Sequence, residues 1–263
     1  TPAGLIGIAY RGGDPPSPLM FQRQRENGGW TPARPLMRQD ISPQYTHVGA
    51  TLVCDHEGTL YVGGHFYNTT DTGSPGAAVL KSSDLGETWS GMDGSPADTP
   101  ILLEERFAVP HQGEGDVRLV GMALDSDQNL WASTASSDAS QVTVWKDGWQ
   151  STDVKPFLPD TLAADAGPIT IDNEDRIHMV VELNVPMKDR NEGWGHPGLE
   201  VFHLMSRDAG KSFECNQISP SDGTVANWLP AISLGGIHQP FELPTVLYTR
   251  GIPGEGCSPT TQT

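Results

Sequence analysis

The sequence predicts an all-β fold in which four-stranded antiparallel sheets repeat along the chain. Composition is the first of three observations that predict it. The 263 residues include 30 glycines and 22 prolines, which suits many short strands and turns better than a helical bundle. The other two are an aligned set of three hairpins and a repeated octapeptide. Self-similarity of this kind is typical of a domain built from repeated units.

The three hairpins align without gaps on an aspartate that opens a polar turn. They cover residues 50–62, 120–132 and 167–179, with Asp55, Asp125 and Asp172 at the shared position. Apolar and β-branched residues flank each turn, which is the pattern of strand, turn and strand. We expect each of these hairpins to be the inner half of one repeat unit.

The octapeptides close the outer half of two of these units. Residues 82–89 (Ser-Ser-Asp-Leu-Gly-Glu-Thr-Trp) and 206–213 (Ser-Arg-Asp-Ala-Gly-Lys-Ser-Phe) each follow an apolar strand. The Ser and Asp side chains are expected to bond to backbone amides of a tight turn, and the Gly to adopt a left-handed conformation. The final aromatic residue would fill the seam between sheets. The predicted structural residues are Ser82, Asp84, Gly86, Trp89, Ser206, Asp208, Gly210 and Phe213.

This octapeptide pattern resembles the Asp-box, or BNR, repeat of sialidase-like β-propellers. The resemblance implies a β-propeller of four-stranded blades in one domain, most simply with five blades. The expected units are residues 1–45, 46–110, 111–160, 161–222 and 223–263. The first unit lacks an innermost strand and the last lacks outer strands. Either these pieces complete each other and close the ring, which we favour, or the chain is part of a longer protein.

Charge and composition restrict the partners. With 33 acidic and 16 basic residues the formal net charge is -17, so the surface repels phosphate backbones and nucleic acid is not an expected partner. No apolar run approaches the roughly 20 residues needed to span a bilayer. The start at Thr1 without Met fits either a removed signal peptide or a trimmed chain. A glycosylation triplet at Asn68 and a candidate disulfide between Cys215 and Cys257 would fit a secreted or extracellular protein, with a periplasmic or cell-surface location as alternatives. Self-association is left open.

Candidate ligand-binding residues come from the ends of the aligned strands. His65, Ala135 and Glu182 occupy one strand position in three units, and a looser alignment adds Tyr10 or Arg11 from the first unit and Arg250 from the last. Variation among polar residue types at one position indicates a site built from one residue per blade. Trp194 and His196 lie in a long loop, where they either contact a sugar ring or staple the loop itself.

A second resemblance suggests a reaction. Part of the chain looks like a stretch of BNR-type propeller lyases, which cleave acidic polysaccharides such as ulvan. The matching part comprises His47, the turn from Asp55 to Gly58, and the segment that contains His65 and Tyr67. The Arg-Gly turn after Tyr248 is similar to the turn whose arginine meets the uronate in those enzymes. The chain departs from their pattern because it has no His-Asn pair and its second histidine is displaced.

This resemblance implies β-elimination on a uronate glycan. Arg250 would neutralise the uronate carboxylate, and His47, His65 and Tyr67 would take the proton and protonate the leaving oxygen. Two alternatives remain. One is a sialidase-like exo-glycosidase, for which Arg11 would be the first arginine of a carboxylate clamp. The other is a non-catalytic glycan-binding or assembly propeller. Cys and His show no zinc spacing, and the sequence indicates no cofactor; a structural cation stays open.

Overall fold

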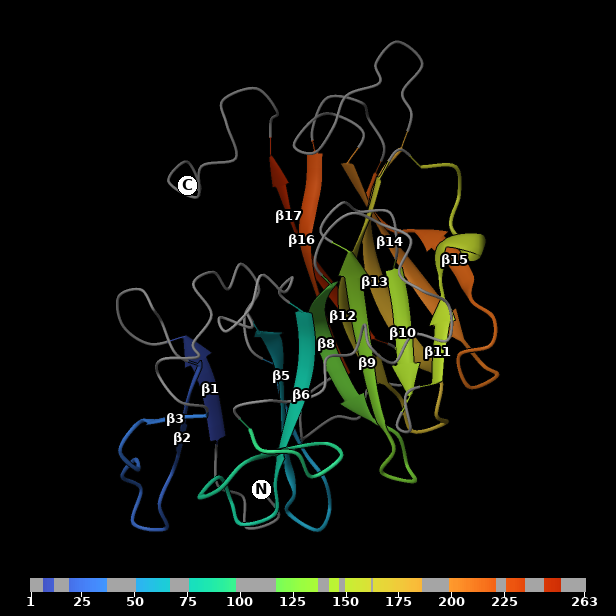
Figure 1. Cartoon of the computed structure of the whole chain (residues 1–263). Helices are drawn as coiled ribbons and strands as arrows, with labels where there is room; N and C mark the ends of the chain where they lie inside the picture. Colours follow the sequence, from blue (N-terminus) through green and yellow to red (C-terminus); the bar gives the residue numbers. More distant parts are fainter. Residues whose placement is uncertain are drawn as a thin grey trace.

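The computed structural model describes eleven stretches of the chain: residues 7–11, 19–36, 51–66, 76–97, 117–136, 142–146, 150–161, 163–185, 199–220, 226–234 and 244–251. Within them the fold is all-β, as the composition predicts (Figure 1). The single helical element described is a 3-10 turn, η3 (Lys155–Phe157). No helix in these stretches is long and apolar enough to cross a membrane.

The described strands form five antiparallel sheets, each a simple meander. Sheet 1 contains β1 (Gly7–Arg11), β2 (Leu19–Arg23) and β3 (Arg34–Pro35). Sheet 2 contains β4 (Thr51–Cys54), β5 (Leu60–Phe66), β6 (Gly76–Ser82) and β7 (Ser90–Gly91). Sheet 3 contains β8 (Val117–Leu124), β9 (Leu130–Ser136), β10 (Val142–Lys146) and β11 (Gln150–Asp153).

Sheets 4 and 5 are also formed by strands that are consecutive in the chain. Sheet 4 contains β12 (Ala163–Ile171), β13 (Ile177–Asn184), β14 (Leu199–Ser206) and β15 (Glu214–Gln217). Sheet 5 contains β16 (Ala226–Ser233) and β17 (Thr245–Gly251). The strands of each sheet fall within one of the five predicted residue ranges. Sheets 1 and 5 have three and two strands where the others have four.

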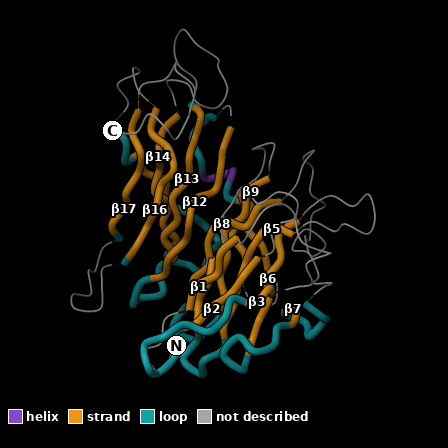
Figure 2. Tube along the Cα trace, turned by 90° about the vertical axis from the view of Figure 1, so that its left-hand side faces the viewer, coloured by secondary structure: helices purple, strands orange, loops and turns teal. Residues whose placement is uncertain are grey.

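The sheets pack face to face in chain order. β4 contacts both β1 and β8, β8 contacts β12, and β12 contacts β16, so the first strands of sheets 2 to 5 lie side by side. Sheets 1 and 5 stand apart in both views, and the described strands form an open arc (Figures 1 and 2). Leu247 on β17 is 69% exposed, which leaves the outer face of sheet 5 uncovered at that point. Ring closure and the number of five blades therefore stay predictions.

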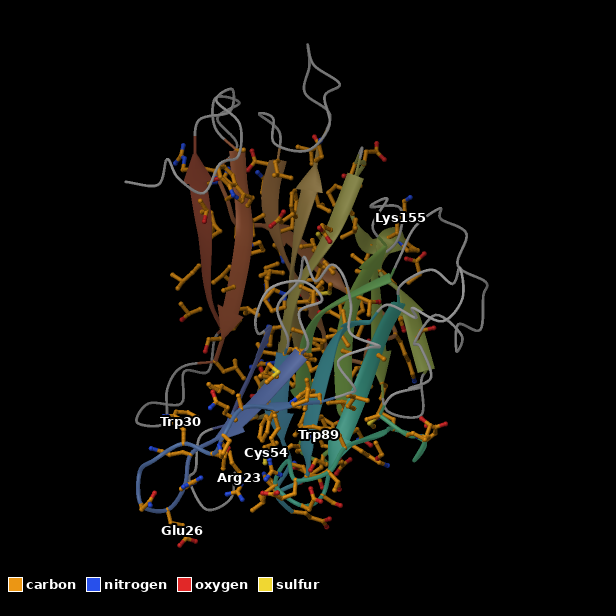
Figure 3. All side chains as sticks on the ribbon, turned by 60° about the vertical axis from the view of Figure 1, so that its left-hand side comes forward. Arg23, Glu26, Trp30, Cys54, Trp89 and Lys155 are labelled. Atoms are coloured by element: carbon orange, nitrogen blue, oxygen red, sulfur yellow. The ribbon has the colours of Figure 1, made fainter. Side chains whose placement is uncertain are left out.

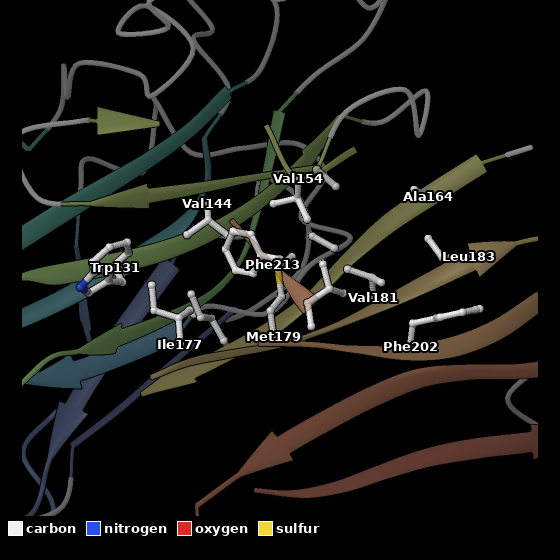
Figure 4. Packing of buried hydrophobic residues seen from close by; sticks show 14 of the residues in the cluster. Trp131, Val144, Val154, Ala164, Ile177, Met179, Val181, Leu183, Phe202 and Phe213 are labelled. Atoms are coloured by element: carbon white, nitrogen blue, oxygen red, sulfur yellow. The ribbon is translucent and has the colours of Figure 1, made fainter. Parts of the chain in front are cut away.

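Apolar clusters fill the seams between sheets 1 and 2, sheets 2 and 3, and sheets 3 and 4. The largest joins sheets 3 and 4, and Figure 4 shows Phe213 inside it, near Val144 and Met179. A second cluster joins sheets 1 and 2 around Phe21, and a third joins sheets 2 and 3 around Leu119. Near the shared inner edge the strands approach so closely that a Cβ at Gly121 would lie 2.7 Å from the backbone of Pro168 and Ile169. The glycine permits this contact between β8 and β12.

Candidate functional site

The two octapeptides form the turns from β6 to β7 and from β14 to β15, with matching hydrogen bonds. In the first, Gly86 N–H donates to Ser82 Oγ at 2.8 Å, and Thr88 N–H donates to Asp84 Oδ1 at 2.9 Å. In the second, Gly210 N–H donates to Ser206 Oγ at 2.9 Å. Both aspartates are exposed. These turns lie on the outer strands of their sheets and serve packing.

Each octapeptide turn also contacts the preceding sheet. Phe213 is buried and its ring lies 5.8 Å from that of Phe157 in η3. Trp89 is only half-buried, and its ring meets Phe21 edge-on at 5.2 Å, at the lower end of sheets 1 and 2 in Figure 3. Glu87 forms ion pairs with Arg23 and Arg34 of sheet 1.

The acidity of these aspartates follows from their bonds. Burial opposes ionisation of Asp84, but hydrogen bonds from Thr88, Ser82 and Glu87 lower its pKa to about 2. Hydrogen bonds from Ser212 and Ser206 lower the pKa of Asp208 to about 2 as well. Both carboxylates therefore stay ionised near neutral pH, as turn-forming acceptors.

The three inner turns share a second set of bonds. Asp55, Asp125 and Asp172 each accept a hydrogen bond at Oδ1 from the backbone N–H four residues on, at 2.7–2.9 Å. Oδ2 faces the side chain six residues on: Tyr61 Oη at 3.1 Å, Trp131 Nε1 at 2.9 Å and His178 Nε2 at 3.1 Å. Three chemically different donors thus fill one structural role.

In sheet 4 this arrangement extends into a buried chain of polar groups. Because Asp172 only accepts, His178 donates through Nε2–H, and its Nδ1 accepts from Nε2–H of His203 at 3.1 Å. Burial opposes ionisation of Asp172, but bonds from His178 and Arg176 lower its pKa to about 2. Burial, followed by the nearby His178, lowers the pKa of His203 to about 4. The neutral His203 is therefore the native form.

The inner turns are also linked to one another. The residue three positions after the aspartate has a left-handed backbone, with φ values of +93° at Gly58, +65° at Gln128 and +57° at Asp175. Gln128 Oε1 accepts the backbone N–H of His56 at 2.9 Å. Asp175 accepts both the N–H and the hydroxyl of Ser126, at 2.8 and 2.6 Å. Side chains thus connect sheets 2, 3 and 4 at their turn ends.

Several predicted site residues lie wholly or partly outside the described structure. His47, Tyr67, Trp194 and His196 are outside the described residues. Tyr10, Arg11 and His65 are described by their backbone alone, at the ends of β1 and β5. That the predicted proton-transfer residues meet in one site stays a prediction.

The register does place Ala135, Glu182 and Arg250 at one position. Sheets 3, 4 and 5 each have an irregularity in the pairing of their first two strands. In each sheet we compare the second residue pair before this irregularity. That pair is Arg118 with Ala135 in sheet 3, Asp165 with Glu182 in sheet 4, and Asn227 with Arg250 in sheet 5. Ala135 is buried in the apolar cluster between sheets 3 and 4, so in sheet 3 this position serves packing.

Asp165 and Asn227 are candidate residues that the sequence analysis missed. They lie on the first strands of sheets 4 and 5, opposite Glu182 and Arg250. The sequence does show Asp165 as a charged residue inside the otherwise apolar run of residues 163–171. Its partner on the next strand cannot be found by sequence alignment, because the pairing of the two strands is irregular. Asp165 and Glu182 are both half-buried, and like charges directly opposite each other on paired strands are destabilising.

Arg250 is exposed near the end of β17. The ends of β5 and β17, which carry His65 and Arg250, are well separated in both views (Figures 1 and 2). The described strands therefore do not bring these two positions together.

Cys215 and Cys54 are free thiols, so the structure does not contain the disulfide proposed for Cys215. Cys257 is outside the described residues. Burial raises the pKa of the Cys215 thiol to about 11, which makes it a poor nucleophile near neutral pH. Within the described stretches, no cluster of three or more His, Cys, Asp and Glu residues could hold a metal ion.

Comparison with known structures defines the class of fold. No model of a known protein family matches the sequence, and no curated protein does. The solved structures that resemble the chain include β-propellers, among them carbohydrate-active enzymes. Their identities of 12–16% show the fold alone.

Three matched structures illustrate the range. An α-L-arabinofuranosidase from Fusarium graminearum has a TM-score of 0.56 at 15% identity, covering 94% of this chain and 71% of its own. An ulvan lyase of the PL25 family has a TM-score of 0.55 at 13% identity, covering 85% of this chain and 55% of its own. A protein of unknown function from Dyadobacter fermentans has a TM-score of 0.50 at 16% identity, covering 88% and 69%. The chain thus spans about half the length of the ulvan lyase.

Proposed function

We propose that the protein is a secreted, carbohydrate-active β-propeller that cleaves uronate-containing polysaccharide by β-elimination. The observation that carries the proposal is the place of Arg250, exposed near the end of β17 at the ladder position that Glu182 holds in sheet 4. In a chain with net charge -17, an exposed arginine at a strand end is a suitable attractor for a carboxylate. An ulvan lyase is among the solved structures with this fold, so the fold accommodates such chemistry.

The proposed reaction needs three groups. The Arg250 guanidinium binds both oxygens of the uronate carboxylate and makes the adjacent C–H more acidic. A neutral histidine or ionised tyrosine removes that proton; His47 and Tyr67, outside the described residues, are the candidates, because the strand end that carries His65 is well separated from that of Arg250. A second of these groups protonates the departing glycosidic oxygen as the C–O bond breaks, which leaves an unsaturated uronate on one product.

The test is to incubate the protein with uronate polysaccharides and follow the ultraviolet absorbance of unsaturated sugar products. Arg250→Lys keeps the charge but loses the planar fork, so turnover should fall about tenfold or more while the melting temperature stays nearly constant. Arg207→Lys is the matched control, because Arg207 is also exposed but lies in the octapeptide turn of sheet 4. Equal turnover in both variants would contradict the clamp.

A second candidate, glycoside hydrolysis, is favoured by Asp165 opposite Glu182. Directly paired residues of an antiparallel ladder have Cβ atoms roughly 4.5–5.5 Å apart. Partners at that Cβ spacing can bring their carboxyl groups to the separation of about 5–5.5 Å at which retaining glycosidases hold their acid and nucleophile. The matched arabinofuranosidase shows that hydrolases share the fold. The sialidase-like alternative is a separate case, because sialidases use a tyrosine nucleophile in place of the second carboxylate.

Hydrolysis releases reducing ends without the absorbance of an unsaturated product, so one incubation separates the two reactions. The substrates should include arabinans and sialosides beside uronate glycans. Glu182→Gln should abolish hydrolysis, whereas Glu214→Gln, at an exposed position of β15, should not. If neither reaction occurs and the protein still binds glycan or self-assembles, the non-catalytic alternative holds.

A further inference from the structure

A cluster of buried polar side chains joins sheets 4 and 5. Glu200 on β14 and Asn227 on β16 are fully buried, and Ser219, just after β15, is 4% exposed. Oε2 of Glu200 accepts hydrogen bonds from Ser219 Oγ at 2.5 Å and from Asn227 Nδ2 at 2.9 Å. One carboxylate oxygen thus ties together two sheets and the segment that follows β15.

The amide oxygen of Asn227 is the unexplained atom of this cluster. Oδ1 is buried and accepts no hydrogen bond in the structure. Rotating the amide by 180° does not solve this, because it would place Oδ1 against the Glu200 carboxylate. A buried polar atom of this kind calls for a partner such as a water or an ion.

The chemistry of the cluster is that of a hard cation site. Carboxylate and amide carbonyl oxygens, together with waters, are the ligands that calcium takes from proteins in flexible geometry, and the Ser219 hydroxyl adds one more oxygen here. We propose that a calcium ion binds at Asn227 Oδ1, with oxygens of Glu200 and Ser219 as further ligands. The ion attaches the two-stranded sheet 5 to the face of sheet 4. A buried water at Oδ1 is the alternative occupant.

The role follows from the place of sheet 5 in the arc. A two-stranded sheet has little stability of its own, and the outer face of sheet 5 is exposed at Leu247. Its attachment therefore depends on the face that meets sheet 4, where β16 contacts β12, β13 and β14. A ligand that binds only the folded seam stabilises the whole chain by mass action.

The experiment is thermal unfolding of the full chain after treatment with EDTA, titrated with CaCl2. We expect a saturable rise in melting temperature, of about 5 °C or more at a hundredfold excess over Kd, and one bound ion by calorimetry. MgCl2 at equal ionic strength should give a smaller shift. Asn227→Leu should lose the calcium shift. Asn227→Asp should melt lower in EDTA, because it places a carboxylate beside Glu200, and should gain a larger shift with calcium.

Asn216→Asp is the matched control, because it adds the same charge at an exposed position of β15. It should keep the wild-type calcium response. A wild-type protein with no calcium shift overturns the proposal and assigns Asn227 Oδ1 to a water. An equal shift in wild type and Asn227→Leu also overturns it, since that result means diffuse binding to the acidic surface. If Asn227→Leu does not fold, calorimetry on the wild type decides: absence of a site with stoichiometry one refutes the ion.

Discussion

Asp175 provides the sharpest test of how the sheets are held together. Its left-handed backbone, with φ of +57°, is unfavourable for most residues, and its carboxylate accepts two hydrogen bonds from Ser126 of the neighbouring turn. Asp175→Ala removes both bonds and keeps the backbone strain. Asp175→Gly removes the same bonds and relieves the strain, because glycine adopts this conformation freely.

The magnitudes follow from these contacts. Each lost bond is worth about 0.5–1 kcal/mol at this exposed site, so Asp175→Ala should lower the free energy of unfolding by about 2 kcal/mol once the poorer fit of alanine is included. Asp175→Gly should cost about 1 kcal/mol. Ser126→Ala removes one hydroxyl donor, and a double-mutant cycle with Asp175→Ala should give a coupling energy of about 0.5–1 kcal/mol.

Urea unfolding followed by tryptophan fluorescence measures the wild type, the three single variants and the double variant. The explanation fails if Asp175→Gly is as destabilising as Asp175→Ala, because backbone strain would then have no part in the effect. It also fails if the coupling energy is zero, because Ser126 and Asp175 would then act independently.

Three further predictions concern packing and pH. Phe213→Ala should lower the free energy of unfolding by about 3–5 kcal/mol, and the half-buried Trp89→Ala by about 2 kcal/mol, both in urea titrations with substrate preference unchanged. Gly121→Ala should cost about 2–3 kcal/mol, since a Cβ would lie 2.7 Å from neighbouring backbone, whereas Gly29→Ala should cost less because its nearest neighbour is a side-chain atom. The pKa of His203 is lowered from 6.5 to about 4, so its neutral form is native and the unfolded chain binds the extra proton. Stability should therefore fall as pH drops from about 6.5 to about 4, by about 1–2 kcal/mol after allowance for partial exposure, and His203→Asn should remove that slope; an unchanged slope would contradict the assignment.

The local structure was accessible from the sequence because short-range chemistry determines it. Asp55, Asp125 and Asp172 open equivalent turns, and the octapeptides form outer turns with matching bonds. These features depend on side chains bonding to backbone within a few residues, which spacing in the sequence reveals.

The contacts between sheets were not accessible in the same way. The pairing of Asp165 with Glu182 depends on an irregular register, and the cluster around Asn227 joins residues from three separate segments. Alignment of a single sequence can place Glu182 and Arg250 at one strand position, but it cannot say which strand end lies beside which. The separation of the ends of β5 and β17 is a property of the whole arc.

The side-chain links between the inner turns have a consequence for how such a chain can change. His56, Gln128, Ser126 and Asp175 fix sheets 2, 3 and 4 to one another at a single end of the strands. Each of β5, β9 and β13 runs from such a turn toward the opposite end, where Glu182 and the predicted position of His65 lie. The links that align sheets 2, 3 and 4 are thus at the opposite end of the strands from the surface that would bind a ligand. Segments at the strand ends opposite these turns can be exchanged, by evolution or by loop grafting, without altering the hydrogen bonds that connect sheets 2, 3 and 4.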